Sequence, residues 1–256
     1  MKAYYEPLRD NQNNVHFVKN KNYIFNPHFH SAIEILIVKK GVCPVNVNGK
    51  DYTITDGQIA FFDSFEFHGY SDNATDNCQT MVIILPPVFV EKFTIQKQGK
   101  HVKNFIISDF ELCDTIMDII EKFVNKNNNQ QIVSASVDLI LSLIYPRLEY
   151  VEEDKNSSFN LLKEILSYLN NNFKQDINLD SISKTFGYSN AHISRLFNGV
   201  VKRTIRQYVN DLRVEYVKKR LNDIPKPSVT ELIYESGFNS IQTYYRALEK
   251  YTNQNN

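Results

Sequence analysis

The chain of 256 residues has little of several features that mark particular protein classes. Its three cysteines, Cys43, Cys78 and Cys113, lie far apart and form no CxxC pair, which argues against a disulfide framework or a zinc knuckle. No apolar run approaches the roughly 20 residues needed to cross a bilayer, and the N-terminus has no apolar signal-peptide core. We therefore expect a soluble, cytoplasmic protein without membrane contacts.

Motifs of the common enzyme classes are also missing. The sequence has no P-loop, no GxGxxG after a predicted strand, and no Ser/His/Asp or Cys/His pattern in a catalytic context. It therefore assigns no catalytic residue and no cofactor.

The formal net charge is zero, but the two parts of the chain differ. Residues 1–155 carry 15 Lys and Arg against 20 Asp and Glu, whereas residues 156–256 carry 14 against 9. The excess of positive charge in the C-terminal part fits a polyanionic partner, and its size is modest.

Residues 15–85 are predicted to form short strands that build a small β-sandwich or barrel. The turns are signalled by Asn48-Gly49 and Asp56-Gly57. The strands are expected at apolar or alternating runs, namely Ile33–Val38, Val42–Val47, Tyr52–Thr55, Ile59–Phe62 and Met81–Leu85.

From about Asp109 the apolar residues recur at helical spacing, which predicts a pair of helices at about 109–123 and 133–145. This pair packs on the barrel alone or also joins two copies of the chain in a homodimer. The acidic segment that follows separates domain 1–150 from domain 159–256, with 151–158 as linker.

The C-terminal domain is predicted to be all-α and contains one pattern twice. Ile182–Tyr188 and Leu232–Phe238 each read as a short amphipathic helix, a glycine turn and an aromatic residue. A second helix follows each time and carries Arg195 or Arg246. This is the layout of a helix-turn-helix DNA reader, and two of them predict contact with two successive major-groove segments.

The apolar residues of each second helix are expected to pack inward. Asn and Ser side chains can hydrogen-bond base edges, and Arg can pair with guanine or hold a phosphate. A helix over 205–221, about 25 Å long, is expected between the readers and would set them about one duplex turn apart. The candidate DNA contacts are the outward residues Asn190, Ala191, Ser194 and Arg195, then Gln242, Thr243 and Arg246.

Residues 160–251 resemble the DNA-binding domain of AraC-type bacterial transcription regulators. The matching stretches are Leu179–Ser189, Ser194–Phe197, Tyr208–Glu215, Val229–Leu232 and Gly237–Ser240. The resemblance implies a two-headed DNA-binding domain joined to a regulatory domain, usually in a homodimer and often under a small-molecule effector. Double-stranded DNA and RNA polymerase are then the expected macromolecular partners.

Four positions depart from that family pattern. Ser183 and Ile233 stand where the family usually has alanine, and Lys202 replaces a glycine after the first reading helix. Glu249 stands where lysine is usual, which is expected to weaken a phosphate contact.

The N-terminal half contains His28-x-His30-x3-Glu34-x6-Gly41, which resembles a cupin barrel motif together with Gly57 and His68. In cupin enzymes the three histidines and the glutamate bind one metal ion, whereas in AraC-type regulators the barrel usually binds an effector or nothing. We assign no metal here and expect a small-molecule pocket lined by His28, His30, Glu34, Phe62 and His68.

Three alternatives remain open beside a DNA-binding regulator with an effector pocket. The barrel residues are purely structural, the chain is a cupin-type metalloenzyme of the oxygenase or isomerase class, or it regulates through protein contacts alone.

Overall fold

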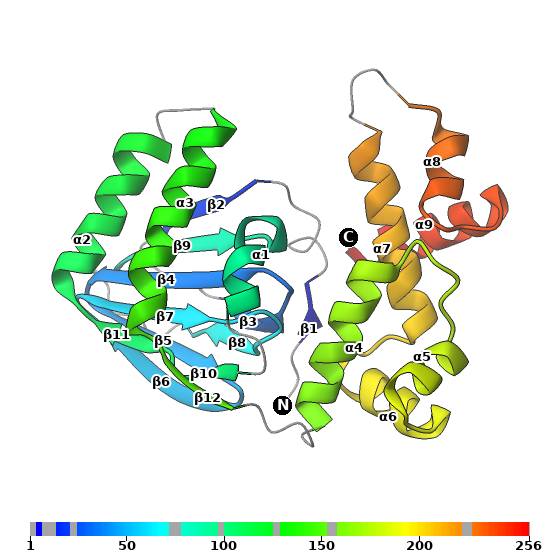
Figure 1. Ribbon diagram of the computed structural model, residues 1–256, viewed down its shortest axis with the longest axis horizontal. Coiled ribbons are helices and arrows are strands. Elements are labelled where there is room, and N and C mark those ends of the chain that lie inside the picture. Colours follow the sequence, from blue (N-terminus) through cyan, green and yellow to red (C-terminus); the bar gives the residue numbers. More distant parts are fainter. Residues whose placement is uncertain are drawn as a thin grey trace. The chain divides into compact units, whose positions relative to one another are not determined.

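Two compact units, Met1–Glu153 and Asp154–Asn256, make up the chain (Figure 1). The first combines β-sheets with helices and the second is helical, which confirms the predicted α+β class. The boundary between the units falls within residues 151–158. The structure, a computed structural model, describes residues 4–6, 14–20, 25–71, 78–96, 100–124, 129–152, 158–221 and 227–255.

The N-terminal unit contains two five-stranded sheets, with strand orders β1-β3-β8-β5-β6 and β11-β7-β4-β9-β2. Only the β1–β3 pairing is parallel among these described ladders. The strands are β1 (Tyr4–Tyr5), β2 (His16–Asn20), β3 (Phe25–Phe29), β4 (Ile33–Lys40), β5 (Val42–Val47), β6 (Lys50–Thr55), β7 (Gln58–Phe62), β8 (His68–Tyr70), β9 (Gln79–Leu85) and β11 (Ile106–Ser108).

The predicted strands are confirmed, but the sheets do not close into the predicted barrel. Within the described residues no strand belongs to both sheets. The turns at Gly41 and Gly57, both at positive φ, carry the chain from one sheet to the other instead of extending one ladder around. The unit is therefore a sandwich of two sheets.

Strand β4 is buried on both faces. Ile33, Ile35 and Ile37 pack in the core beneath the helices, whereas Leu36 and Val38 pack in the core between the sheets. Full burial of each such side chain contributes about 1.5–3 kcal/mol. Because side chains alternate along a strand, Glu34 lies on the face that points between the two sheets.

Helices cover the outer face of the β4 sheet (Figure 1). The predicted pair is confirmed, and Asp109 and Asn129 cap the two helices by accepting from backbone amides. These elements are α2 (Phe110–Ile119), its π-helical continuation η2 (Ile120–Val124), α3 (Gln130–Ile144) and the 3-10 turn η3 (Tyr145–Arg147).

Strands β1 and β11 and three further elements of this unit were not predicted. Pro86 and Pro87 follow the end of β9, and Pro87 is the first residue of helix α1 (Pro87–Gln96), a position that needs no amide hydrogen. Strands β10 (Lys100–Asn104) and β12 (Glu149–Glu152) form an antiparallel ribbon, so the acidic segment begins in a strand.

The C-terminal unit consists of helices arranged around α7. Figure 1 shows α5 and α6 at one end of α7, with α8 toward its other end. With 16 residues, α7 spans about 24 Å. The helices are α4 (Ser158–Asn172), α5 (Leu179–Phe186), α6 (Asn190–Val201), α7 (Ile205–Arg220), α8 (Val229–Glu235) and α9 (Ile241–Asn255). None of the helices described is long and apolar enough to cross a membrane.

Local signals fix the ends of these helices. Asn178 and Ser181 form a reciprocal capping box at the start of α5, and Gly187 ends it at φ 74°. Lys202 takes the left-handed conformation at the end of α6 despite its side chain, at a cost of about 1–2 kcal/mol relative to glycine. Ser183 and Ile233, the departures from alanine, are both buried.

The two turn glycines differ in their surroundings. At Gly187 an added Cβ would meet nothing within 4 Å, whereas at Gly237 it would lie 2.4 Å from the carbonyl oxygen of Lys174. The same Cβ would lie 3.0 Å from Nε of Arg213, which donates to the carbonyl oxygen of Phe173 at 2.7 Å. Gly237 therefore permits a close approach of three chain segments.

We expect Gly187→Ala to destabilise the chain by about 1–2 kcal/mol, the cost of a left-handed alanine. Gly237→Ala should cost about 1–3 kcal/mol more, because it adds steric overlap with backbone. Scanning calorimetry of the full chain checks this, and equal losses in the two variants would contradict the close packing at Gly237.

Candidate functional site

Helix α6 presents one apolar and one polar face. Ile193, Phe197 and Val201 are buried, and the ring of Phe197 meets that of Tyr208 in α7 at 5.5 Å between centroids. Of the predicted outward residues Asn190, Ala191 and Arg195 are exposed, and Ser194 is half-buried. The apolar spacing therefore predicted the orientation of this helix.

Some of these side chains already have partners. The Asn190 amide donates to the carboxylate of Asp180, and the Ser194 hydroxyl accepts from the amide of Asn198 at 3.2 Å. Tyr188 and His192 are also exposed. Their rings stack on each other, with centroids 5.0 Å apart. Sequence reasoning missed this pair, although His192 falls on the same helical face as Arg195.

Helix α9 repeats the arrangement. Tyr244, Ala247 and Tyr251 pack in a core with Val214 and Val217 of α7. The predicted contacts Gln242 and Arg246 are exposed. Thr243 is half-buried, with its hydroxyl 2.9 Å from that of Ser240. Tyr245, which sequence reasoning did not select, is 54% exposed beside Arg246.

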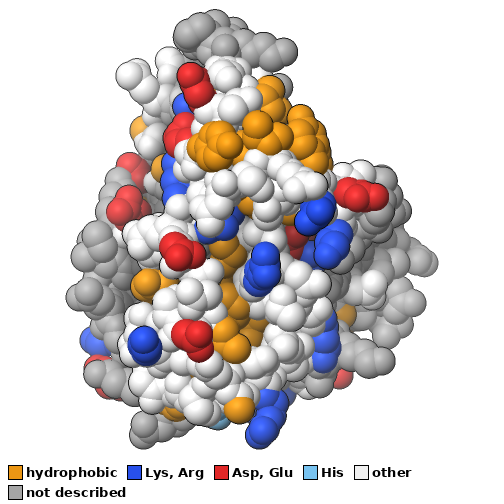
Figure 2. Space-filling view, turned by 90° about the vertical axis from the view of Figure 1, so that its right-hand side faces the viewer, with side chains coloured by type: hydrophobic (Ala, Val, Ile, Leu, Met, Phe, Trp, Pro, Cys, Tyr) orange, Lys and Arg blue, Asp and Glu red, His pale blue; other side chains and the backbone are white. Residues whose placement is uncertain are grey.

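The surface drawn in Figure 2 carries Lys and Arg side chains among acidic ones, and apolar side chains gather near its upper end. The charge is mixed rather than uniformly basic. Binding to a polyanion through such a surface depends on a few well-placed cations.

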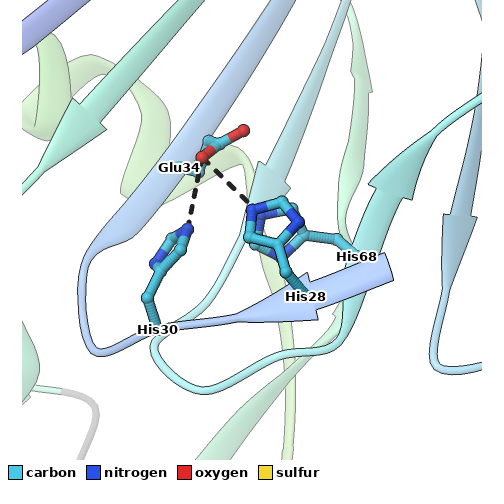
Figure 3. A group of neighbouring side chains, drawn as sticks. All are labelled: His28, His30, Glu34 and His68. Carbon is cyan, nitrogen blue, oxygen red and sulfur yellow. Dashed lines mark hydrogen bonds and ion pairs between the residues drawn. The ribbon is translucent and has the colours of Figure 1, made fainter. Parts of the chain in front are cut away.

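In the N-terminal unit the structure brings all five predicted pocket residues together. His28, His30, Glu34 and His68 converge between the two sheets (Figure 3), and each is at most 1% exposed. One ligand atom from each of these four lies within 4.8 Å of the others. Phe62 stacks on the ring of His68, with centroids 4.7 Å apart and planes at 3°.

Backbone carbonyls orient the three imidazoles. Nδ1 of His28 lies 3.0 Å from the carbonyl oxygen of Asn26, Nδ1 of His30 lies 3.0 Å from that of Ala32, and Nδ1 of His68 lies 2.9 Å from that of Glu66. A carbonyl only accepts, so each Nδ1 carries a hydrogen. In the neutral rings the lone pair is therefore on Nε2.

Several polar side chains contact the carboxylate of Glu34. Its Oε2 is 3.3 Å from Nε2 of His30 and 3.6 Å from Nε2 of His68, and its Oε1 accepts from the Tyr70 hydroxyl. A second carboxylate belongs to Glu6, directly after β1, whose Oε2 lies 3.6 Å from Nε2 of His28.

Burial dominates the electrostatics of this cluster. It lowers the pKa of His28 to about 2, with the neighbouring His68 contributing in the same direction. Burial acts to raise the pKa of Glu34, but hydrogen bonding from the His30 and His68 imidazoles, whose Nε2 atoms donate to the carboxylate when these rings are protonated, outweighs it, and the pKa lies well below its usual value. At neutral pH the cluster thus combines a carboxylate with a neutral His28.

The rings are packed against one another. Their centroids are 4.4 Å apart for His28 and His68, 5.0 Å for His30 and His68, and 5.3 Å for His28 and His30. Such separations are those of ring contact. The space among the four side chains therefore suits an ion better than an organic molecule.

Comparison with known proteins covers both units. A model of the AraC-like ligand binding domain matches residues 15–169, and a helix-turn-helix domain model matches residues 182–255. The chain belongs to the AraC family. It is a transcription regulator with an N-terminal ligand-binding domain and a C-terminal helix-turn-helix DNA-binding domain.

Individual relatives of this AraC-family chain are distant. The HTH-type transcriptional activator RhaS of Escherichia coli O81 is 26% identical over 235 residues, which cover 87% of this chain and 84% of RhaS. The uncharacterized HTH-type transcriptional regulator YdeC of Bacillus subtilis is 22% identical over 243 residues, or 88% and 82%. A crystal structure of an apo ToxT variant from Vibrio cholerae is 14% identical, with a TM-score of 0.49 and 93% of each chain covered.

The lowered pKa of His28 predicts a pH-dependent stability in the metal-free protein. The pKa of His28 is about 2 in the folded chain and 6.5 in the unfolded chain. Between these two pH values the unfolded chain therefore binds a proton at His28 that the folded chain does not. Stability is therefore complete above the unfolded pKa and falls with decreasing pH, by up to about 1.4 kcal/mol per unit.

Urea unfolding of chelator-treated protein at about pH 7 and about pH 5 measures this loss. His28→Asn preserves a donor to the carbonyl of Asn26 and removes the titration, so its stability should fall less over the same interval. His192→Asn, at an exposed position, is the matched control. An equal fall in His28→Asn and the unaltered chain would show that another group is responsible.

Proposed function

We propose that this AraC-family regulator binds double-stranded DNA sequence-specifically through α6 and α9, under the control of a small ligand in the N-terminal unit. The observation that supports this most directly is the repeated design of the C-terminal unit. In each half a helix buries its apolar face against α7 and exposes an arginine, Arg195 or Arg246.

The outward side chains suit base and phosphate recognition. The two arginines offer bidentate contacts to guanine or single contacts to phosphate. The amides of Asn190 and Gln242 offer the donor and acceptor pair that adenine needs, and the methyl group of Ala191 suits thymine. Ser194 and Thr243 contribute hydroxyls once their internal hydrogen bonds exchange for bases.

The length of α7 suits two contacts on one duplex. Successive major-groove segments on one face of DNA lie about 34 Å apart. A helix of about 24 Å, with a reading helix packed at each end, bridges most of that distance. This favours simultaneous reading of two segments over an adaptor that makes protein contacts alone.

The buried cluster of His28, His30, Glu34 and His68, with Phe62 stacked on it, is the proposed ligand site. These residues are at most 1% exposed, which suits retention of a ligand better than turnover of a substrate. A regulator is therefore favoured over the cupin-type metalloenzyme. RNA polymerase is the partner through which such a regulator would act on transcription.

We expect Arg195→Ala and Arg246→Ala each to weaken binding by about 5–150-fold, since a bidentate contact contributes about 1–3 kcal/mol. The test uses a duplex selected by the unaltered chain from a random library, with affinity measured by fluorescence anisotropy over a range of salt concentrations. The control is Lys50→Ala, which also removes one positive charge but lies in β6 of the N-terminal unit. Unchanged affinity in Arg195→Ala would remove α6 from the proposal.

A homodimer through α2, η2 and α3 is the second part of the proposal. Phe110, Phe123 and Leu139 are 66%, 52% and 50% exposed, and large exposed apolar side chains on adjoining elements favour a partner surface. The occupant we propose is a second copy of the same chain, as the family usually forms dimers.

Leu139→Glu should convert the dimer to monomer in sedimentation velocity at micromolar concentration, because a carboxylate would be buried at the interface. Val88→Glu makes the same change at an exposed position of α1 and should leave the dimer intact. A monomeric unaltered chain would contradict the homodimer.

A further inference from the structure

We propose that His28, His30, Glu34 and His68 bind one divalent first-row transition-metal ion, and that this ion is the ligand of the N-terminal unit. Three nitrogen donors and one carboxylate meet at a single point between the sheets (Figure 3). The inference rests on the proposed function only for the regulatory role of the ion. Metal binding itself is independent of DNA.

The backbone prepares the imidazoles for an ion. Each Nδ1 of the three histidines donates to a backbone carbonyl two residues away, at 2.9 or 3.0 Å. Histidines that ligate metals typically donate their other ring N–H in this way, which fixes the tautomer and aims the free nitrogen at the ion. Here the arrangement directs the Nε2 atoms of His30 and His68 toward Glu34.

The resulting cluster needs a positive charge. With hydrogens on Nδ1, neutral rings present the Nε2 lone pairs of His30 and His68 to the carboxylate of Glu34 at 3.3 and 3.6 Å. Lone pairs and a carboxylate repel one another at such distances, and burial removes the water that would screen them. A proton on one imidazole satisfies one contact, whereas a single ion at the centre satisfies all four donors.

The dimensions fit an ion with only a small contraction. Two ligand atoms of one transition-metal ion, each about 2.1 Å from it, lie about 3.4 Å apart in a tetrahedral site and about 4.2 Å apart on opposite sides of an octahedral one. The four donor atoms here lie within 4.8 Å of one another, so side-chain shifts of a fraction of an ångström would complete the site. The Tyr70 hydroxyl already orients Glu34 from the other side.

The donor types select the class of metal. Imidazole suits zinc, iron, nickel and copper(II), whereas magnesium and calcium prefer a shell of oxygen atoms. The thiols of Cys43, Cys78 and Cys113 do not belong to the cluster, so the soft donors that favour copper(I) are missing from it.

The experiment uses the full-length chain after removal of bound metal with a chelator. Cobalt(II) is the spectroscopic probe and zinc(II) the calorimetric one, with magnesium(II) as the negative control. We expect one equivalent of cobalt or zinc per chain and visible cobalt absorption bands. Failure to bind one equivalent of either ion would overturn the proposal.

Glu34→Gln keeps the shape of the side chain and should weaken zinc binding by at least about 100-fold, since even an outer-shell change costs about 10–100-fold. His101→Ala lies outside the cluster and should bind as the unaltered chain does. Equal affinities in Glu34→Gln and the unaltered chain would overturn the assignment.

A measurement on the unaltered chain avoids any folding defect of a variant. The X-ray absorption spectrum of the zinc-loaded protein should show three imidazole ligands and an oxygen ligand without sulfur. Sulfur ligands, or fewer than three imidazoles, would place the ion elsewhere and overturn the proposal.

The regulatory role has its own readout. Affinity for the selected duplex should differ by at least about fivefold, or about 1 kcal/mol, between zinc-loaded and chelator-treated protein. Equal affinities would overturn the ion as effector while leaving DNA binding by α6 and α9 intact. Loss of DNA binding in both states would instead count against the proposed function.

Discussion

The C-terminal unit depends on α7, because both reading helices are packed against it. Near its start Tyr208 meets Phe197 of α6 and its hydroxyl accepts from Asn170 of α4 at 2.7 Å. Further along, Val214 and Val217 belong to the core of α8 and α9. One helix thus contributes to both cores, and the two reading helices cannot rotate independently without exposing apolar surface. Arg203, just before α7, donates to the carboxylate of Asp211 in α7. Burial nevertheless raises the pKa of Asp211 to about 6, so the guanidinium offsets only part of the cost of burying this charge.

Local signals predicted the elements whose boundaries depend on neighbouring residues. Asn178, Asp109 and Gly187 act at helix ends, and their chemistry is visible in the sequence. Asn48 and Gly49 both take positive φ in the turn between β5 and β6, as their hairpin signal indicates. The ribbon of β10 and β12 was missed, because it arises from pairing between distant segments. The pattern of strands and turns left a sandwich or a barrel open, since the choice depends on which distant strands pair. Helix α1 was not predicted, because Pro86 and Pro87 mark the end of β9 in the sequence.

In the candidate sites, too, local spacing predicted some features, whereas others depend on the folded structure. Apolar spacing was enough to orient α6 and α9, since burial of one helical face leaves the other outward. It did not reveal the stack of Tyr188 on His192, which needs the turn geometry after Gly187. The spacing of the N-terminal motif identified the residues of the buried cluster. It did not show how tightly they meet, because β3, β4 and β8 are brought together only by the folded sandwich.

The ligand site and the proposed dimer surface share one strand. Glu34 lies on the inter-sheet face of β4, between Ile33 and Ile35, whose side chains lie in the core with residues of α2 and α3. In a strand a shift of one residue moves its neighbours, because the alternating side chains are carried by one backbone and close-packed cores yield little to displacement. A ligand that draws Glu34 toward the three imidazoles therefore acts on the strand that supports both helices. This places ligand binding and helix packing on opposite faces of β4, which is a direct physical route by which the first would influence the second.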